Sequence, residues 1–310
     1  MIKTERAVAL GYFDGFHIGH REVLGNTLEA FERGLVPAVM LFDVPPAEAV
    51  TRKKVPRLMM DTERNEILKN SGFELLFVSF SEIRDMSPHE FAEKILRDRF
   101  NAAEVYCGFN YSFGKDGSGK SDTLISECGM LGIKAYVSDC VTSDGEQVSS
   151  GTVRKLIENG EIEKANKMLG YYFGFTSSVF TGDRRGRLLG WPTVNQYLPD
   201  GLVTPKFGVY ASVALIDGEK HAGVTNIGKR PTFDGESLRS ETFILGFSGD
   251  LYGRDITVRL VSFIRSEMKF SSAEALKIQI GKDEKAASVR TKALIDNVGG
   301  AYIKKNKKKC

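Results

Sequence analysis

Two histidines three residues apart, His17 and His20, have the types and spacing best suited to chemistry in this chain. They follow an apolar run, Ala7–Leu10, that predicts a buried strand, and they precede a helical pattern. The N–H groups and dipole of a helix N-terminus attract anions, and imidazoles can donate hydrogen bonds to phosphate oxygens that gain charge. We therefore predict a phosphate-handling site, with surface or N-capping histidines as the plainer alternative. Half of a metal site is a further alternative, which is disfavoured because no third His and no paired Cys lies nearby. The candidate residues are Gly11, Phe13, Asp14, Gly15, His17, Gly19 and His20.

Two further segments carry polar groups that suit a nucleotide or a flavin. Residues 108–115 follow a strand-like run and contain Asn110, whose amide fits a ribose, a base or a flavin phosphate, although Asn and Gly are also usual turn residues. Residues 148–154 place two hydroxyls at a helix start, where they act as N-caps first and as phosphate ligands second. Arg154 can bind a phosphate through its planar guanidinium. The candidates in this second segment are Ser149, Ser150 and Arg154.

A glycine- and arginine-rich stretch, residues 182–195, ends in Pro-Thr-Val-Asn. Thr193 and Asn195 alternate on an extended segment, so their oxygens face the same way and suit a magnesium ion. A glycine-rich hairpin with solvated arginines is the alternative for the first half. Further along, the Glu241 carboxylate leads into an apolar strand and could take a hydroxyl proton, although such carboxylates are more often merely solvated. The phosphate-binding candidates in the stretch are Gly182, Gly186, Arg187 and Gly190.

These candidates are placed by two different patterns of elements. As far as about Tyr136, apolar runs alternate with amphipathic helical segments, which predicts a parallel sheet wrapped by helices with ligands at the carboxyl ends of the strands. The expected strands are 7–10, 38–42, 75–80, 105–107 and 135–137, and the expected helices are 21–33, 62–70, 88–100 and 122–131. Val23, Leu24, Leu28 and Phe31 are expected to share the buried face of the first helix.

Two short helices are expected over 150–158 and 162–169. After them, from Gly170 on, the pattern of apolar and polar residues changes. The segments that follow are strand-like and separated by Gly, Asp and Pro clusters, which predicts an antiparallel barrel or sandwich. A long helix is expected from Ser272 to about Asp296, with Ala275, Leu276, Ile278 and Ile280 buried. The predicted domains are 1–169 and 170–298, with a basic tail over 299–310.

Composition limits the function classes. The chain has 310 residues, 42% apolar and 27% charged, with a net charge of +3. The last residues contain five lysines, and without them 38 basic face 40 acidic residues, so a nucleic-acid surface is disfavoured and an RNA-contacting tail is the weaker reading. No apolar run is long enough to span a bilayer. Four cysteines without metal-ligand spacing predict reduced, mostly buried thiols of a cytoplasmic protein, with no close pairing among Cys107, Cys128, Cys140 and Cys310.

Taken in order, these motifs resemble the bacterial bifunctional riboflavin kinase/FMN adenylyltransferase family, also called FAD synthetases. The resemblance extends from about Ala7 to Arg290. The segments that carry it are GYFDGFHIGH (11–20), GFNYSFGK (108–115), VSSGTVR (148–154), GRLLGWPTVN (186–195), TNIGKRPTF (225–233), GDLYG (249–253) and IRSEMKF (264–270).

The resemblance implies a Rossmann-like nucleotidylyltransferase domain that transfers AMP from ATP to FMN, followed by a β-barrel kinase that phosphorylates riboflavin. It implies that His17 and His20 stabilise the triphosphate, that Asn110 positions FMN or nucleotide, and that Glu241 is the general base of the kinase. Magnesium would be bound by Thr193 and Asn195. The implied flavin neighbours are Asn226, Arg230, Arg265 and Glu267.

The implied partners are therefore riboflavin, FMN and ATP, with magnesium as the metal and a monomer or weak homo-oligomer as the assembly. The family usually reads Phe-Glu-Pro-His-Pro after the second strand, and here Phe42 is followed by Asp-Val-Pro-Pro, without the histidine. Gly151 replaces a usual Thr, and Val194 replaces a usual Ala. The missing histidine motivates an alternative, a kinase whose N-terminal domain only binds nucleotide or flavin. A third interpretation is a flavin- or nucleotide-binding regulator that contacts RNA through its tail.

Overall fold

The computed structural model describes residues 4–182, 191–232 and 235–295, with no side-chain description for residues 231–236. The predicted phosphate ligands Gly186, Arg187 and Gly190 and the lysine tail lie outside these residues. Contacts divide the chain into two compact units, one that ends at Ser150 and one that begins at Gly151.

The first unit contains a parallel sheet whose strands follow the apolar runs of the sequence. Its order is β3-β2-β1-β4-β5, so the chain moves outward from β1 to β3 and then returns to the other side of β1. The inward side chains Val8, Met40 and Val105 are fully buried in one core. The strands are β1 (Arg6–Leu10), β2 (Val36–Phe42), β3 (Glu74–Val78), β4 (Ala102–Gly108) and β5 (Lys134–Ser138).

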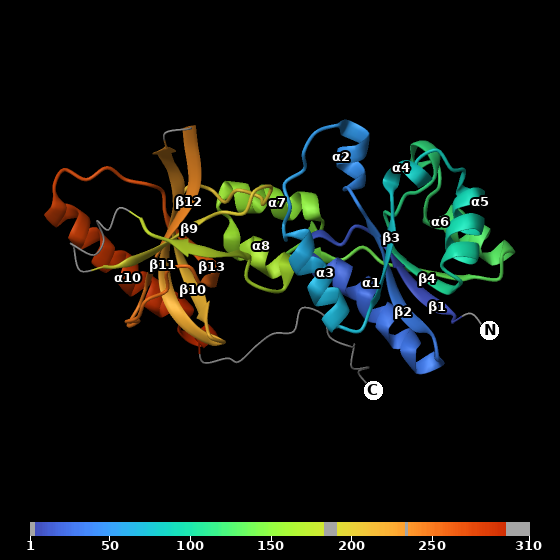
Figure 1. Cartoon of the computed structure of the whole chain (residues 1–310), viewed down its shortest axis with the longest axis horizontal. Coiled ribbons are helices and arrows are strands. Elements are labelled where there is room, and N and C mark those ends of the chain that lie inside the picture. The colour runs from blue at the N-terminus through green and yellow to red at the C-terminus, as the bar shows by residue number, and fades with distance from the viewer. Residues whose placement is uncertain (1–3, 183–190, 233–234, 296–310) are drawn as a thin grey trace. The chain divides into compact units, whose positions relative to one another are not determined.

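Helices cover both faces of this sheet, with α1 and α3 on one side and α5 and α6 on the other (Figure 1). The helix that starts at Pro88 changes to π-type hydrogen bonds over Phe91–Arg99. The helices are α1 (Ile18–Glu29), α2 (Pro46–Thr51), α3 (Asp61–Asn70), α4 (Phe80–Ile83), α5 (Pro88–Glu90) and α6 (Ser121–Met130). The remaining elements are the 3-10 turns η1 (Asp14–Phe16), η2 (Ala30–Arg33) and η4 (Lys115–Gly117) and the small strands β6 (Thr142–Ser143) and β7 (Glu146–Gln147).

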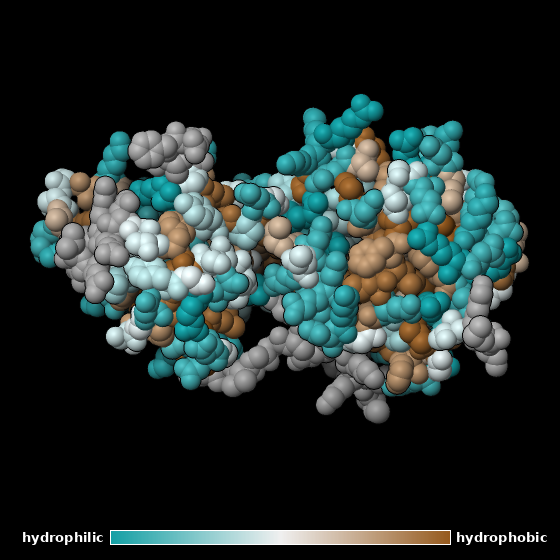
Figure 2. Space-filling view, viewed as in Figure 1, coloured by the Kyte–Doolittle hydropathy of each residue, from teal (hydrophilic) through white to brown (hydrophobic). Residues whose placement is uncertain are grey.

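One expected core position in this unit is wrong. Val23, Leu24 and Leu28 are buried as expected, but Phe31 is 63% exposed. The α-helix ends at Glu29, and the following residues form a tighter 3-10 turn. Because that turn advances by a larger angle per residue, Phe31 leaves the buried stripe. Figure 2 shows that hydrophobic residues also reach the visible surface over the strands of this unit, and the edge strand β3 carries Phe77, which is 52% exposed.

The second unit is a closed antiparallel barrel with the strand order β10-β11-β12-β9-β8-β13. Its interior contains fully buried hydroxyl side chains as well as apolar ones, since Thr225 donates to Ser212 and shares a hydrogen bond with Thr242. The strands are β8 (Gly174–Phe180), β9 (Thr193–Tyr197), β10 (Gly208–Ile216), β11 (Glu219–Thr232), β12 (Gly235–Ile244) and β13 (Asp255–Arg265). The helices are α7 (Ser150–Asn159), α8 (Ile162–Leu169) and α10 (Ala273–Ile295).

The long helix α10 packs against β10, β11 and β13 of the barrel (Figure 1). Its buried residues are Asp283, Ala287 and Thr291, at a spacing of four. The expected buried face is wrong: Ile278 is 56% exposed, and Ala275, Leu276 and Ile280 are only half-buried. The contact stripe uses small residues and one ion-paired carboxylate, so the size of the apolar side chains did not identify it.

Cys107 and Cys128 are buried and Cys140 is exposed, and these three thiols are free. Burial raises the pKa of Cys107 and of Cys128 to about 12. In the described part of the chain, no helix combines the length and the hydropathy required to cross a bilayer.

Candidate active sites

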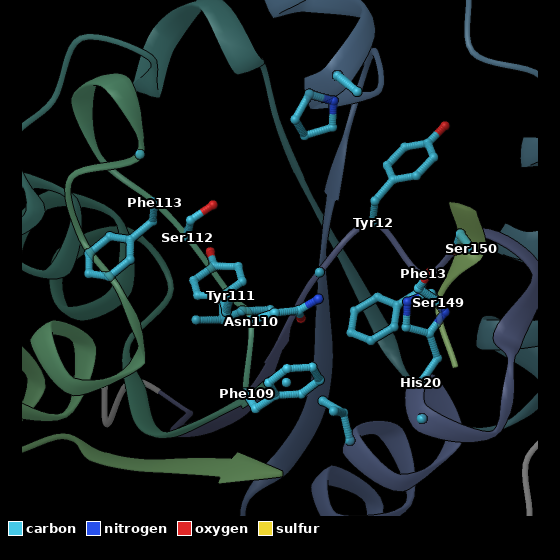
Figure 3. A pocket seen from close by; sticks show the side chains of 18 of the residues that line it. Tyr12, Phe13, His20, Phe109, Asn110, Tyr111, Ser112, Phe113, Ser149 and Ser150 are labelled. Atoms are coloured by element: carbon cyan, nitrogen blue, oxygen red, sulfur yellow. The ribbon is translucent and has the colours of Figure 1, made fainter. Parts of the chain in front are cut away.

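A pocket of about 580 Å³ lies in the first unit, at the carboxyl ends of β1 and β4. This is the point where the strand order reverses, which is where open α/β sheets bind ligands. In Figure 3, residues 109–113 lie on one side of the pocket, and Phe13, His20, Ser149 and Ser150 lie on the other. The predicted site residues that line it are Gly11, Phe13, His17, Gly19, His20, Asn110, Ser149 and Ser150.

His17 and His20 are brought together by the start of α1. Nδ1 of His17 accepts the backbone N–H of His20 at 3.2 Å and so caps the helix, and the two rings stack with centroids 3.6 Å apart. Since Nδ1 of His17 is an acceptor, the neutral ring carries its proton on Nε2. Both rings therefore lie at the positive end of a helix dipole, where a bound triphosphate is stabilised.

The turn before α1 is held in a strained, left-handed conformation. Phe13, Gly15 and Phe16 have φ angles of 55°, 78° and 42°. Asp14 is 2% exposed, and its carboxylate accepts the backbone N–H groups of Leu58, at 2.9 and 3.0 Å, and of Met59, at 3.2 Å. Asp14 therefore fastens the turn to the segment before α3, and it does not line the pocket.

The second predicted segment places Ser150 against the same turn. The Ser150 hydroxyl, at the end of the first unit, donates to the backbone oxygen of Asp14 at 3.1 Å. Arg154 lies one turn later on α7, in the second compact unit, and its part in phosphate binding stays a prediction.

An aromatic segment forms the facing wall of the pocket. Asn110 follows β4 in a tight turn that is closed by the N–H of Tyr111 and the oxygen of Gly108 at 3.0 Å. The rings of Tyr111 and Phe113 stack with centroids 5.8 Å apart, and burial raises the pKa of Tyr111. A planar ring system and a hydrogen-bonding amide are thus available on one side, opposite the histidines (Figure 3).

The segment without the usual histidine forms another part of the wall. Pro45 and Pro46 start the short helix α2, which lines the pocket with residues 46, 47, 50 and 51. The Asp43 carboxylate accepts hydrogen bonds from the hydroxyl of Ser79 and the backbone N–H of Phe80 at 2.8 and 3.1 Å. Burial opposes ionisation of Asp43, but these bonds outweigh it and lower the pKa. The Asp43 carboxylate therefore connects the residues that follow β2 to those that follow β3.

Sequence reasoning missed a polar network around Tyr12, which also lines the pocket. The Tyr12 hydroxyl donates to Asp61 at 3.0 Å, and the guanidinium of the buried Arg64 lies 4.8 Å from the ring centroid and 3.0 Å from the same carboxylate. Arg57 lies 5.7 Å from the centroid and binds Glu48 of α2 at 2.6 Å. Burial, followed by Asp61, raises the pKa of Tyr12 to about 12, so the phenol remains a donor. These ion partners lie on a loop and helix far along the chain, and no motif indicates them.

The second candidate site is on the outer face of the barrel. Strand pairing places Glu241 of β12 directly between Asn226 of β11 and Asn195 of β9. Directly opposed residues point to the same face of a sheet. The neighbours Thr225 and Thr242 are fully buried inside, so the row formed by Asn226, Glu241 and Asn195 faces outward. Three predicted site residues thus come together by register.

Thr193 lies two residues before Asn195 and shares its face of β9. Asn195 Nδ2 donates to the Thr193 backbone oxygen at 3.3 Å, which leaves its amide oxygen directed elsewhere. A β-carbon at Gly182 would lie 2.5 Å from Cγ of Asn195, so Gly182 permits a close approach of the chain. The hydroxyl and amide oxygens fit the preference of magnesium for oxygen ligands. In the described ranges there is no cluster of three or more His, Cys, Asp or Glu side chains that suits a metal.

The other predicted flavin neighbours have protein partners. Arg265 binds the buried Asp283 of α10 through three hydrogen bonds, at 2.7 to 3.1 Å. Arg230 binds Glu241 at 3.0 Å. The Glu267 carboxylate lies over Gly228, since a β-carbon there would be 2.5 Å from its Oε1.

Sequence reasoning also missed a hydrogen bond from the indole of Trp191 to Glu284 of α10, at 3.1 Å. It connects the start of β9, which carries Thr193 and Asn195, to the helix that holds Arg265. The Trp-Pro-Thr order showed only an extended segment, and the partner is 93 residues away.

Comparison with known proteins gives both units a counterpart. A family model described as FAD synthetase matches residues 1–152, and one described as riboflavin kinase matches residues 169–290. The chain is 34% identical to the bifunctional riboflavin kinase/FMN adenylyltransferase of Listeria monocytogenes, over 90% of both chains. It is 35% identical to proteins of that name from Bacillus subtilis, over 93% of this chain and 94% of the relative, and from Escherichia coli, over 90% and 91%.

A solved structure titled as a macrolide-efflux protein from Streptococcus pneumoniae has the same fold. It superposes with a TM-score of 0.84 at 30% identity, and covers 93% of this chain and 95% of its own. The alternative of a kinase with a degenerate N-terminal half is not supported, because the FAD synthetase model matches that half and the relatives are named for both activities. The chain belongs to the bifunctional riboflavin kinase/FMN adenylyltransferase family.

Proposed function

We propose that the chain makes FAD from riboflavin in two ATP-dependent steps, one at each site. The barrel phosphorylates riboflavin to FMN, and the pocket of the first unit adenylylates FMN. The observation that carries the proposal is the row of Asn226, Glu241 and Asn195 on the barrel, which occurs in the same chain as the stacked His17 and His20. A cytoplasmic location, expected from the reduced thiols, belongs to this proposal.

In the kinase step, Glu241 accepts the proton of the riboflavin 5′-hydroxyl. The hydroxyl oxygen forms a bond to the γ-phosphorus of ATP, the bond from that phosphorus to the β,γ-bridging oxygen breaks, and ADP leaves. Thr193 and Asn195 would hold magnesium, which offsets phosphate charge when bound. Glu241 is 31% exposed, so a hydroxyl can reach its carboxylate.

In the adenylyl transfer step, a phosphate oxygen of FMN attacks the α-phosphorus of ATP. The bond to the α,β-bridging oxygen breaks, and pyrophosphate leaves with the electron pair. Because a phosphate monoester is already an anion at neutral pH, this step needs no general base. Hydrogen-bond donors to the triphosphate are sufficient. Nε2–H of His17 and the N-terminus of α1 can stabilise the negative charge that builds up on the triphosphate oxygens.

The two steps are tested by a time course of riboflavin, FMN and FAD with ATP, with and without added magnesium. The expected order is FMN first and then FAD, both dependent on magnesium. Glu241→Gln is expected to abolish FMN formation while added FMN is still converted to FAD. A folded Glu241→Gln protein that loses both activities equally contradicts the assignment of two sites.

A further inference from the structure

The carboxylate of Glu241 has an ion-pair partner on the next strand. Both Nε and Nη2 of Arg230 donate to the same atom, Oε1 of Glu241, at 3.1 and 3.0 Å. Two donors that converge on one oxygen restrain the position of that oxygen and leave Oε2 for another hydrogen bond. The proton acceptor of the proposed kinase step is thereby given a defined orientation.

The backbone of β11 explains how Arg230 reaches this carboxylate. Asn226, Gly228 and Arg230 alternate on one face of the strand, and Glu241 is paired with Asn226. The arginine side chain must run back along its own strand past Gly228, which has no side chain of its own to block it. The room above Gly228 is limited by Glu267, whose Oε1 would lie 2.5 Å from a β-carbon at that position.

Arg239, a second cation on this face among the described residues, is held elsewhere. Arg239 of β12 lies opposite Gly228, two residues from Glu241. Its guanidinium lies 5.2 Å from the ring centroid of Phe180 and 5.1 Å from that of Tyr197, and its Nε donates to Ser237. Arg239 therefore faces an aromatic pair, whereas Arg230 binds Glu241.

We propose that Arg230 is a positioning residue for Glu241 in riboflavin phosphorylation, an inference that rests on the proposed role of Glu241 as the general base. The family resemblance implies instead that Arg230 lies next to the flavin. The side chains of Arg230 and Glu241 are 48% and 31% exposed, and an exposed ion pair contributes little to folding. Orientation of the carboxylate is the effect that such a pair can supply, since small errors in placement are costly in rate.

The test compares Arg230→Gln and Arg230→Lys with Lys229→Gln as the matched control. Lys229 is the neighbouring cation, so Lys229→Gln removes the same charge as Arg230→Gln. The alternation of β11 directs Lys229 to the other face of the strand, away from Glu241. For Arg230→Gln we expect kcat of FMN formation to fall on the order of 10- to 100-fold with KM for riboflavin nearly unchanged. Arg230→Lys should recover part of the rate, and guanidinium chloride at millimolar concentration should partly rescue Arg230→Gln.

Conversion of added FMN to FAD, measured in the same samples, controls for folding and should not change. A wild-type rate in Arg230→Gln overturns the proposal, and so does a rate above wild type, which would make Arg230 a blocking group. A rise in KM without a fall in kcat also overturns it, because Arg230 would then bind substrate.

Glu241→Gln separates this inference from the proposed function. If Glu241→Gln is inactive as a kinase and Arg230→Gln is not impaired, the positioning role fails while the general base stands. If Glu241→Gln keeps the wild-type rate, the general base itself is wrong and the positioning role falls with it.

Discussion

His17 and His20 are tied to each other twice, by rings that stack with centroids 3.6 Å apart and by a hydrogen bond from the backbone N–H of His20 to Nδ1 of His17. One side chain is therefore placed to serve two functions, a cap that the structure shows and a phosphate donor that we propose. It caps α1, and through its other nitrogen it can donate to a phosphate. These two functions can be separated by substitution, because asparagine also caps helices but lacks the second donor at that distance.

His17→Asn is expected to lower the rate of FAD formation from added FMN on the order of 10²- to 10³-fold, as the loss of one transition-state donor does elsewhere. The helix cap should survive, so thermal stability should stay close to that of the wild type. His17→Ala should lose the same activity and also about 1 kcal/mol of stability. The measurements are initial rates and thermal unfolding.

Riboflavin phosphorylation provides the internal control for both His17 variants, since it takes place on the barrel. A His17→Asn protein that keeps full FAD formation would show that His17 is only a cap. Equal stability of the two variants would show instead that the bond to His20 does not stabilise the helix.

Gly182→Ala should specifically impair the kinase. Its β-carbon would lie 2.5 Å from Cγ of Asn195, so the amide must move from the row that contains Glu241. We expect at least a tenfold lower rate of FMN formation and a higher magnesium requirement, with FAD formation from added FMN unchanged. Gly281→Ala is the matched control, because no described residue beyond its chain neighbours and its own helix backbone lies within 4 Å of the β-carbon it would add. Equal kinase rates in the two variants would contradict a role for this close approach.

Much of both sites followed from the sequence because the motifs lie at strand ends. In a parallel sheet the carboxyl ends of adjacent strands meet, so Asn110 after β4 had to come near His17 after β1. Alternation placed Thr193 and Asn195 on one face in the same way. The order of the parallel strands and the alternation of side chains along one strand are therefore enough to predict where these residues lie.

The remaining contacts depend on registers and loops that no local rule determines. The pairing of Asn226 with Glu241 needs the exact register of a long hairpin, and a shift by one residue would turn Glu241 inward. The partners of Tyr12 come from residues 57–64, where ordinary loop and helix residues gave no signal. The error at Ile278 has a related cause, since α10 packs through small residues and through Asp283, whose carboxylate is bound by Arg265 from a distant strand.

Tyr12→Phe tests the network beside the pocket. The substitution keeps the ring between Arg57 and Arg64 but removes the hydrogen bond to Asp61, a loss of about 0.5–1.5 kcal/mol. Backbone amides in residues 57–64 should therefore exchange with deuterium about two- to tenfold faster. Tyr136→Phe is the control, because Tyr136 is a half-exposed tyrosine of the same unit that packs by stacking on another ring. Unchanged exchange in Tyr12→Phe would show that the hydroxyl does not hold this segment.

Thiol reactivity tests the packing of the first unit around the pocket. Burial raises the pKa of Cys107 and Cys128 to about 12, while Cys140 is exposed. The thiolate is the reactive form, so at pH 8 the two buried thiols are protonated as well as inaccessible. Iodoacetamide should modify Cys140 within minutes and leave Cys107 and Cys128 unmodified in native protein, as peptide mass spectrometry can measure. Raising the pH to 9.5 should not change this order of labelling, because that pH is still more than two units below the pKa of the two buried thiols. Rapid labelling of Cys107, which lies on β4 directly before the Asn110 segment, would mean that the strand next to the histidine turn opens on the timescale of the reaction.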